Sequence, residues 1–320
     1  IRSTIVFYKN KKVLVTGAGG LVGSQVAKML HEQGAIVRAS YRGRKVPSWV
    51  GDVETVKADF MNIEDVKKCV EGMDIVFVCS ANTSGAGVMA HDPLQHVTPN
   101  LIMNSTLMEQ SYRAGVERFF FVSSATTYPP ADYPIKEEEM MSGDPYTTYF
   151  GVGWMKRYTE ILAQFYQRNE MMKIAIVRPA NIYGIQGDFT DETGHVLPAL
   201  IRRALEKQTP YVVWGNPDVV RDFTHSVDMA RACLDVVEKH AVCDPINIAS
   251  GNLVTIGESV DLILKYAGHD IEPEYDESKP VTIQYRALDT SKANDVIGYK
   301  PTISFEDGIK ETVEWIRENM

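Results

Sequence analysis

The stretch Val13-Leu-Val-Thr-Gly17-Ala-Gly-Gly20-Leu-Val-Gly23 joins a short apolar run to a glycine-rich turn. Residues 21–32 then repeat apolar side chains at helical spacing, so the pattern predicts a buried strand, a tight turn and a helix. Gly17 allows the chain to turn, Gly20 allows the backbone to approach a pyrophosphate, and Gly23 allows the helix to pack on the strand. Because the first turn of a helix leaves N–H groups and a partial positive charge free, the stretch predicts a dinucleotide phosphate site.

Apolar runs and helical patterns keep alternating after this turn, which is typical of a parallel sheet with helices on both faces. The expected helices are 21–32, 63–71, 100–114 and 149–168, and the expected strands are 13–16, 35–41, 55–58, 74–80, 118–123 and 173–178. After Pro179 the alternation stops, and glycine, proline and aromatic residues increase. The sequence therefore predicts an α/β fold, a doubly wound parallel (Rossmann) sheet with a smaller mixed C-terminal lobe.

The chain is expected to divide between two lobes, since 320 residues fit about two domains. A dinucleotide-binding domain takes residues 1–178 and is rejoined by 224–249, because Pro245–Ile248 is a short apolar strand that can return to the main sheet. A substrate-binding lobe takes residues 179–223 and 250–320. Amphipathic helices are expected in it over 256–267 and 305–319.

The composition excludes several classes of protein. The chain holds 33 Lys and Arg against 42 Asp and Glu, which gives a net charge of −9, and 44% of its residues are hydrophobic. These values are ordinary for a globular protein and exclude a disordered, collagen-like or disulfide-stapled chain. Net acidity argues against general nucleic-acid binding, although local basic groups can still hold a phosphate.

Neither membrane insertion nor secretion is expected. No apolar run reaches the roughly 20 residues that a membrane span needs, and residues 1–12 lack the layout of a signal peptide. The four cysteines, at positions 69, 79, 233 and 243, are scattered and form no Cys-x-x-Cys pair. They indicate free thiols of a reducing compartment rather than a metal site. We therefore expect a cytoplasmic protein without a bound metal.

The residues after the second predicted strand bear on the choice of cofactor. An acidic residue at this place binds the adenosine ribose and repels a 2′-phosphate. Here the strand ends in Ser40-Tyr41-Arg42, with Arg44 and Lys45 close behind, and holds no carboxylate. These cations predict a preference for NADP, with NAD still possible. The alternative is a solvated basic loop.

Five motifs follow one another along the chain: TGAGGLVG (16–23), SSATTY (123–128), a helix with Lys156, RPANIYG (178–184) and RDFTHSVDMA (221–230). This order resembles the extended short-chain dehydrogenase/reductase family over nearly the whole chain. Within that family the sequence is most similar to nucleotide-sugar epimerases and reductases of the GDP-L-fucose synthase type. The shared features are a glycine-rich stretch (84–88), a Gly-His-Val-x-Pro-Ala-Leu segment (194–200) and a Val-Val-x-Gly strand (212–215).

The resemblance implies an NAD(P)-dependent epimerase or reductase that acts on a nucleoside-diphosphate sugar, with a GDP-sugar favoured, and that forms a homodimer. A hydride is expected to pass between nicotinamide and a sugar carbon, C4. Two alternatives stay open: a C4 dehydrogenase with tightly held NAD(H), and a non-catalytic NADP(H)-binding sensor or scaffold. Sugar dehydratases carry an Asp-Glu pair at the positions of Ala125 and Thr126, so a 4,6-dehydratase is not expected. The cysteine that fucose synthases carry near this strand end is also missing.

The family's catalytic set is a Ser or Thr, a Tyr and a Lys. Ser124 and Lys156 match it, but the position four residues before Lys156 is Val152, which cannot move a proton. Tyr149 lies one turn earlier on the predicted helix, on the face of Lys156, and is a candidate acid/base; alternatively it packs against the second lobe. His195 matches a histidine acid of fucose synthases and titrates near neutrality. Its alternative is an ordinary hydrogen-bonding role.

Further residues are candidate ligands. Arg221 is implied to grip the substrate pyrophosphate, or else to pair with Asp222 or Asp228, and Asp59 either meets the adenine or caps the next helix. The substrate-side candidates are Thr126, Asn181, Arg202 (with Arg203 as its alternative on the same helix) and Arg221. The cofactor-side candidates are Gly17, Gly20, Leu21, Val22, Gly23, Tyr41, Arg42, Asp59, Phe60 and Lys156.

Overall fold

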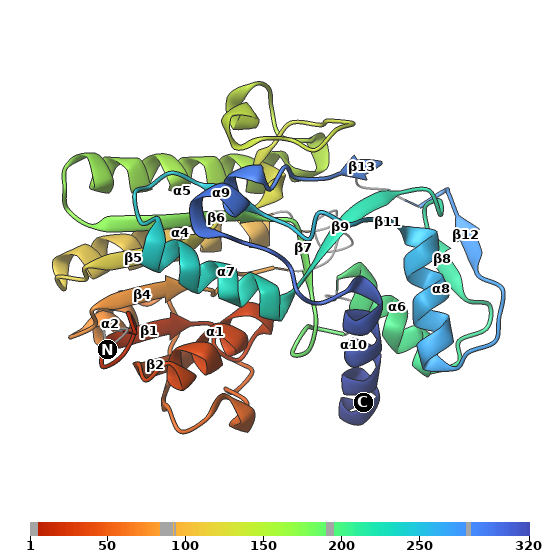
Figure 1. Cartoon of the computed structure of the whole chain (residues 1–320), viewed down its shortest axis with the longest axis horizontal. Coiled ribbons are helices and arrows are strands. Elements are labelled where there is room, and N and C mark those ends of the chain that lie inside the picture. Colours follow the sequence, from red (N-terminus) through yellow and green to blue (C-terminus); the bar gives the residue numbers. More distant parts are fainter. Residues whose placement is uncertain (1–5, 84–91, 93, 190–194, 280–282) are drawn as a thin grey trace, which may run out of the picture.

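Seven parallel strands form the central sheet of the computed structural model, which describes residues 6–83, 92, 94–189, 195–279 and 283–320. Their order is β10-β6-β5-β4-β1-β2-β3, and each pair of neighbours is parallel. The strands are β1 (Lys12–Thr16), β2 (Ile36–Tyr41), β3 (Glu54–Lys57), β4 (Ile75–Val78), β5 (Arg118–Val122), β6 (Lys173–Pro179) and β10 (Ile246–Ile248). The predicted doubly wound sheet is confirmed, including the return of the strand after Pro245 (Figure 1).

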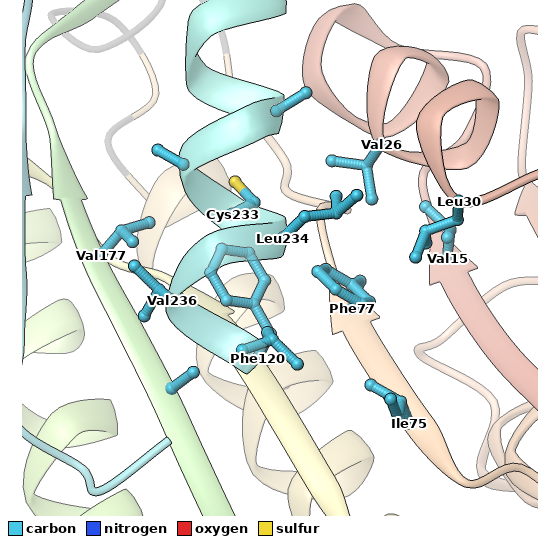
Figure 2. Packing of buried hydrophobic residues seen from close by; sticks show 14 of the residues in the cluster. Val15, Val26, Leu30, Ile75, Phe77, Phe120, Val177, Cys233, Leu234 and Val236 are labelled. Atoms are coloured by element: carbon cyan, nitrogen blue, oxygen red, sulfur yellow. The ribbon is translucent and has the colours of Figure 1, made fainter. Parts of the chain in front are cut away.

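Helices cover both faces of this sheet, because its central strands are apolar on both sides. One face carries α1 (Leu21–Glu32) and α7 (Ser226–Lys239), and the other carries α2 (Ile63–Val70), α4 (Leu94–Arg113) and α5 (Phe150–Arg168). Figure 2 shows the first of these cores, where side chains of α1 and α7 meet those of the strands. The rings of Phe77 and Phe120 lie 5.2 Å apart at its centre.

In the described part of the chain, two small sheets and three helices form the second lobe. In the larger sheet β9 (Val220–His225) pairs with β7 (Asn181–Tyr183), β11 (Leu253–Thr255) and β13 (Tyr285–Arg286). The smaller sheet joins β8 (Val212–Trp214) to β12 (Glu274–Asp276). The helices α6 (Val196–Leu205), α8 (Ile256–Ala267) and α10 (Phe305–Asn319) enclose a separate apolar core. This lobe lies beside the carboxyl ends of the main strands (Figure 1).

The long, strongly periodic helices were predicted to the residue: 21–32, 256–267 and 305–319. The helix predicted over 100–114 begins earlier, at Leu94, and contains Pro99. The strands of the second lobe other than β8 were not predicted, because strands of two to six residues give little periodicity. The division into two lobes stays a prediction. One segment within 250–320, α9 (Ser291–Ile297), packs into the core shared by α1 and α7.

The cysteines and helices add two observations on the described residues. All four cysteines are free thiols; Cys69 and Cys233 are buried, and Cys79 and Cys243 are partly buried. Within the part of the chain that the structure describes, no helix is both long and apolar enough to cross a membrane.

Candidate active site

The glycine-rich turn lies between β1 and α1 and has the geometry of a phosphate cradle. Gly17 has a φ of +65°, and a Cβ atom there would lie 2.8 Å from the Cα of Ser80. A Cβ on Gly23 would lie 2.4 Å from the carbonyl oxygen of Gly17, so the helix packs directly on the turn. Gly20 is the N-cap of α1 and supplies no side-chain cap. The N–H groups of the first turn therefore face outward for an anion, which fits a dinucleotide pyrophosphate.

The three cations that follow β2, predicted to lie on the adenosine side of the cofactor site, have different environments. Arg42 and Lys45 are exposed, whereas Arg44 donates to the carbonyl oxygens of Gln186 and Gly187, at 2.5 and 3.2 Å. The guanidinium of Arg44 is thus directed at the second lobe. Of the three cations after β2, Arg42 and Lys45 remain candidates for a 2′-phosphate, whereas the contacts of Arg44 direct its side chain elsewhere.

Asp59 and Phe60 follow β3 and have different environments. Asp59 is exposed, and its carboxylate accepts from the N–H of Met61 at 3.1 Å. The N-cap of α2 is Asn62, so Asp59 does not cap that helix. The side chain of Phe60 is buried in the core under α2. Of the two, the carboxylate of Asp59 is accessible to a ligand.

Lys156 lies on α5 beside the end of β5. Its Nζ donates to the carbonyl oxygen of Val122 at 2.7 Å and lies 4.7 Å from the centre of the Phe121 ring. Burial lowers the pKa of Lys156 to about 8, and the carboxylate of Glu160 acts in the opposite direction. An ammonium with these contacts is held in place at the carboxyl edge of the sheet, where ligands of such sheets bind.

Ser124 follows β5 and caps the single 3-10 turn Ala125–Thr127. Its Oγ accepts from the N–H of Thr126 at 3.1 Å, so the capping role is observed, while its own proton stays available to an oxygen acceptor. The hydroxyl oxygen of Thr126 is buried and has no hydrogen-bond partner among the described residues. Two hydroxyl groups thus lie at the turn that follows β5, one at its N-cap and one within it.

A buried ion pair fixes the elements beneath Lys156. Glu160 and Arg178 are joined at 2.6 and 3.0 Å, and Ser123 also donates to Glu160. Arg178 donates further to the hydroxyl of Tyr128 at 2.9 Å, and that hydroxyl donates to Asn247 at 2.6 Å. Because each charged group has partners, the network ties α5, β6 and β10 together at the site without an unpaired buried charge.

Tyr149 lies just before α5 rather than on it. The helix begins at Phe150, and Tyr149 is its N-cap. The helical spacing that placed Tyr149 beside Lys156 therefore applies only from Phe150 onwards. Its electrostatic neighbours are Arg221 and Arg286 of the second lobe. The structure therefore brings Tyr149 to the arginines.

Arg221 and Arg286 form a buried pair of cations. They occupy paired positions on the parallel strands β9 and β13, and only 8% and 6% of their surfaces are exposed. Burial lowers the pKa of Arg221 to about 10 and that of Arg286 below its usual range. The Nη2 of Arg286 has no hydrogen-bond partner among the described residues. Two adjacent buried guanidiniums are costly unless an anion binds them.

The carboxylates proposed as alternative partners of Arg221 bind elsewhere. Asp222 accepts from the N–H and hydroxyl of Ser250, and Asp228 is bonded to Arg231 and Thr302. The sequence analysis missed Arg286. Only the pairing of β13 with the distant strand β9 places Arg286 at the site, and no local sequence motif surrounds this residue.

The other predicted substrate ligands are more peripheral. Asn181 is exposed and donates to the carbonyl oxygen of Asp222 at 3.3 Å, close to the arginine pair in the sheet. Arg202 forms an ion pair with Glu206 at 2.8 Å on α6. Arg203 donates to the carbonyl oxygen of Val212 at 2.7 Å. Both arginines of α6 thus have protein partners.

His195 is the N-cap of α6 and belongs to an exposed part of the chain. Protein around the imidazole removes water from it and lowers its pKa, while Asp188 acts in the opposite direction. His96, buried on α4, has a pKa that burial and then the charge of His195 lower. The two histidines therefore approach each other from different lobes, and His96 had not been predicted. The predicted motif residues 84–88 and Gly194 lie outside the described residues.

Comparison with known proteins identifies the family of the chain. Residues 13–249 match the sequence model of the family described as NAD dependent epimerase/dehydratase. The putative GDP-L-fucose synthase 2 of Arabidopsis thaliana is 28% identical over 98% of this chain and 93% of its own length. The structure of UDP-glucose 4-epimerase from Thermotoga maritima, with UDP-glucose, has a TM-score of 0.85 at 27% identity and covers 96% of this chain and 99% of that one. MoeE5 in complex with UDP-glucose and NAD has a TM-score of 0.81 at 26% identity, over 96% of this chain and 99% of its own.

Proposed function

The chain belongs to the NAD dependent epimerase/dehydratase family, and from this premise we propose that it is an NAD(P)-dependent epimerase or reductase whose substrate is a nucleoside-diphosphate sugar. The observation that carries the proposal is the buried pair Arg221 and Arg286, whose two adjacent positive charges suit an anion with two neighbouring negative groups. A pyrophosphate has that form, and guanidinium groups bind phosphate oxygens through paired hydrogen bonds. The similar Thermotoga maritima epimerase contains UDP-glucose, which supports this class of substrate.

The base of the nucleotide and the cofactor are finer parts of the proposal. We assign a GDP-sugar, because the GDP-L-fucose synthases are similar over nearly the whole chain. We assign NADP, because the end of β2 carries no carboxylate and the exposed Arg42 and Lys45 stay available to a 2′-phosphate. The NAD in the MoeE5 complex supports the alternative cofactor.

Lys156 and Ser124 orient the reacting groups in this proposal. A bound nicotinamide would supply hydride transfer to or from a sugar carbon, for which we propose C4. The ammonium of Lys156 donates to Val122 and keeps further protons for the ribose of the cofactor. The hydroxyl of Ser124 accepts from the N–H of Thr126 and keeps its own proton to donate to the reacting sugar oxygen.

We assign the proton transfer to His195, since Val152 has no acidic proton. The lowered pKa of His195 keeps its imidazole neutral at neutral pH, so it is able to accept a proton. Tyr149 has Arg221 and Arg286 as its electrostatic neighbours, so we assign it to the substrate phosphates instead.

We propose a homodimer built on α5. Tyr158, Ile161 and Phe165 are spaced along one face of this helix, and each is about half exposed. Exposed apolar side chains gathered on one face of a helix favour a protein interface. Light scattering of the purified chain should give twice the monomer mass, and Phe165→Glu should reduce it to the monomer mass.

The function is tested by mixing the purified chain with NADPH or NADH and 4-keto GDP- or UDP-sugars. Loss of the reduced nicotinamide absorbance identifies a reductase, and isomerisation of a non-keto sugar nucleotide without net absorbance change identifies an epimerase. Reduction of added NAD⁺ by a sugar nucleotide identifies the C4 dehydrogenase instead. Binding of cofactor and sugar without any turnover contradicts the proposal and supports a sensor, the alternative that Val152 favours.

A further inference from the structure

The loop of residues 42–47 crosses the glycine-rich turn, and both of its ends are anchored. It leaves β2 on one side and reaches the 3-10 turn Ser48–Val50 on the other. Val46 and Trp49 pack against the core shared by α1 and α7, and Lys28 of α1 lies 5.8 Å from the Trp49 ring. Only the middle of the loop is therefore left to respond to a ligand.

The middle of the loop lies directly on the phosphate cradle. A Cβ atom on Gly19 would lie 2.0 Å from the carbonyl oxygen of Arg44 and 3.0 Å from that of Lys45. Gly19 immediately precedes Gly20, the N-cap of α1. The loop is thus one wall of the place where the first turn of α1 offers its N–H groups.

The side chain of Arg44 extends from this wall to the other lobe. Its Nη1 donates to the carbonyl oxygens of Gln186 and Gly187, at 2.5 and 3.2 Å. These carbonyls belong to the segment between β7 and α6, in which Gly184 and Gln186 both have positive φ. Both carbonyls accept from this one nitrogen, so the guanidinium bridges the loop to two successive residues of the other segment through a charged donor.

From these contacts we propose that Arg44 is a positioning residue: it fastens the loop of residues 42–47 across both lobes and so retains the dinucleotide at the glycine-rich turn. The inference rests on the proposed dinucleotide cofactor, which fits the cradle of Gly17, Gly20 and Gly23. We call this bridge between Arg44 and the carbonyl oxygens of Gln186 and Gly187 the clasp. Because the clasp holds one wall of the phosphate site, it should slow the release of NADH and of NADPH equally. A cation that bound the 2′-phosphate would act on NADPH alone.

Release of bound NADH and of NADPH, followed by stopped-flow fluorescence after mixing with excess competitor, tests the clasp. Arg44→Ala should release both cofactors about tenfold faster, because one charge-assisted bridge is lost. Arg44→Lys should give an intermediate rate. Arg317→Ala is the matched control, because Arg317 also donates to a backbone carbonyl, that of Tyr266 at 2.7 Å, but within the second lobe. Its release rates should equal those of the unmodified chain.

Three results would overturn the clasp. Faster release of NADPH alone from Arg44→Ala assigns Arg44 to the 2′-phosphate, and unchanged release of both cofactors leaves it no role in retention. Equal acceleration in Arg317→Ala means that the effect is general loosening. Failure of the proposed function gives a different result: the unmodified chain then binds neither dinucleotide, and this result would also overturn the clasp. Arg44 is exposed, so its variants are expected to fold, and their melting temperatures check this.

Discussion

The two phosphate-binding regions proposed for this molecule are built in opposite ways. The glycine-rich turn, Gly17 to Gly23, is a run of consecutive residues that offers backbone N–H groups. The pair Arg221 and Arg286 comes from two strands, 286 − 221 = 65 residues apart, and offers side-chain charge. The first region therefore depends on the absence of side chains, and the second depends on the charge of two buried side chains. The two should respond to different substitutions.

The largest effect is expected at the glycine-rich turn. In Gly17→Ala the new Cβ would lie 2.8 Å from the Cα of Ser80, in a left-handed conformation. The turn must shift, so dinucleotide affinity should fall about a hundredfold, as measured by fluorescence titration with NADH and NADPH. Sugar-nucleotide affinity should fall much less, because the arginine pair is in the other lobe.

Gly72→Ala is the control for backbone strain. Gly72 also has a positive φ, +72°, but a Cβ atom there meets nothing within 4 Å. Both variants lose stability from the left-handed conformation, while only Gly17→Ala is expected to lose dinucleotide affinity. Equal affinities for the two variants would show that the close packing of Gly17 on Ser80 does not shape the cofactor site.

A smaller effect, with the opposite selectivity, is expected at the arginine pair. Arg286→Met keeps much of the buried volume and removes the charge. The dissociation constant of a GDP- or UDP-sugar should rise about 10- to 100-fold, since a hydrogen bond to a charged group is worth about 1.5–3 kcal/mol. Isothermal titration calorimetry measures it, and dinucleotide affinity should stay unchanged.

Arg317→Met serves as the matched control for loss of an arginine from the second lobe, because Arg317 bonds to Tyr266 at its surface. If Arg286→Met bound sugar nucleotides as well as the unmodified chain does, the pair would not be a phosphate site. A more stable Arg286→Met protein with weaker sugar-nucleotide binding would instead fit two buried cations that are kept for a ligand.

The same contrast explains what the sequence was able to predict. The glycine turn, α1 and the parallel strands are local patterns, and the structure has them where they were predicted. Arg286 was missed because a two-residue strand has no periodicity, and its partner is set by tertiary pairing. Arg44 was predicted as one of the cations near a 2′-phosphate, and its two carbonyl partners were missed because they lie about 140 residues later and carry no side-chain signal. The position of Tyr149 depended on where α5 begins, and helix ends are the least certain part of a pattern.

The smallest effect is expected from titration of Lys156, which lies between the two regions. Burial lowers the pKa of Lys156 to about 8, so the side chain is a charged ammonium below this pH and a neutral amine above it. Because the ammonium is the form that donates to Val122 and to a cofactor ribose, dinucleotide affinity should fall about three- to tenfold as pH rises through 8. Titrations with NADH from about pH 6 to about pH 10 bracket the change.

Lys156→Arg separates this charge from every other group that titrates in the same range. A guanidinium stays protonated over the whole interval, so this variant should bind NADH with little pH dependence. Lys156→Ala should bind NADH more than tenfold more weakly than the unmodified chain at neutral pH. Its affinity should also show no fall as the pH rises through 8. A step that persists in both variants would belong to another group. The glycine turn would then hold the cofactor through its backbone alone, and the contrast with the charge-dependent arginine pair would be complete.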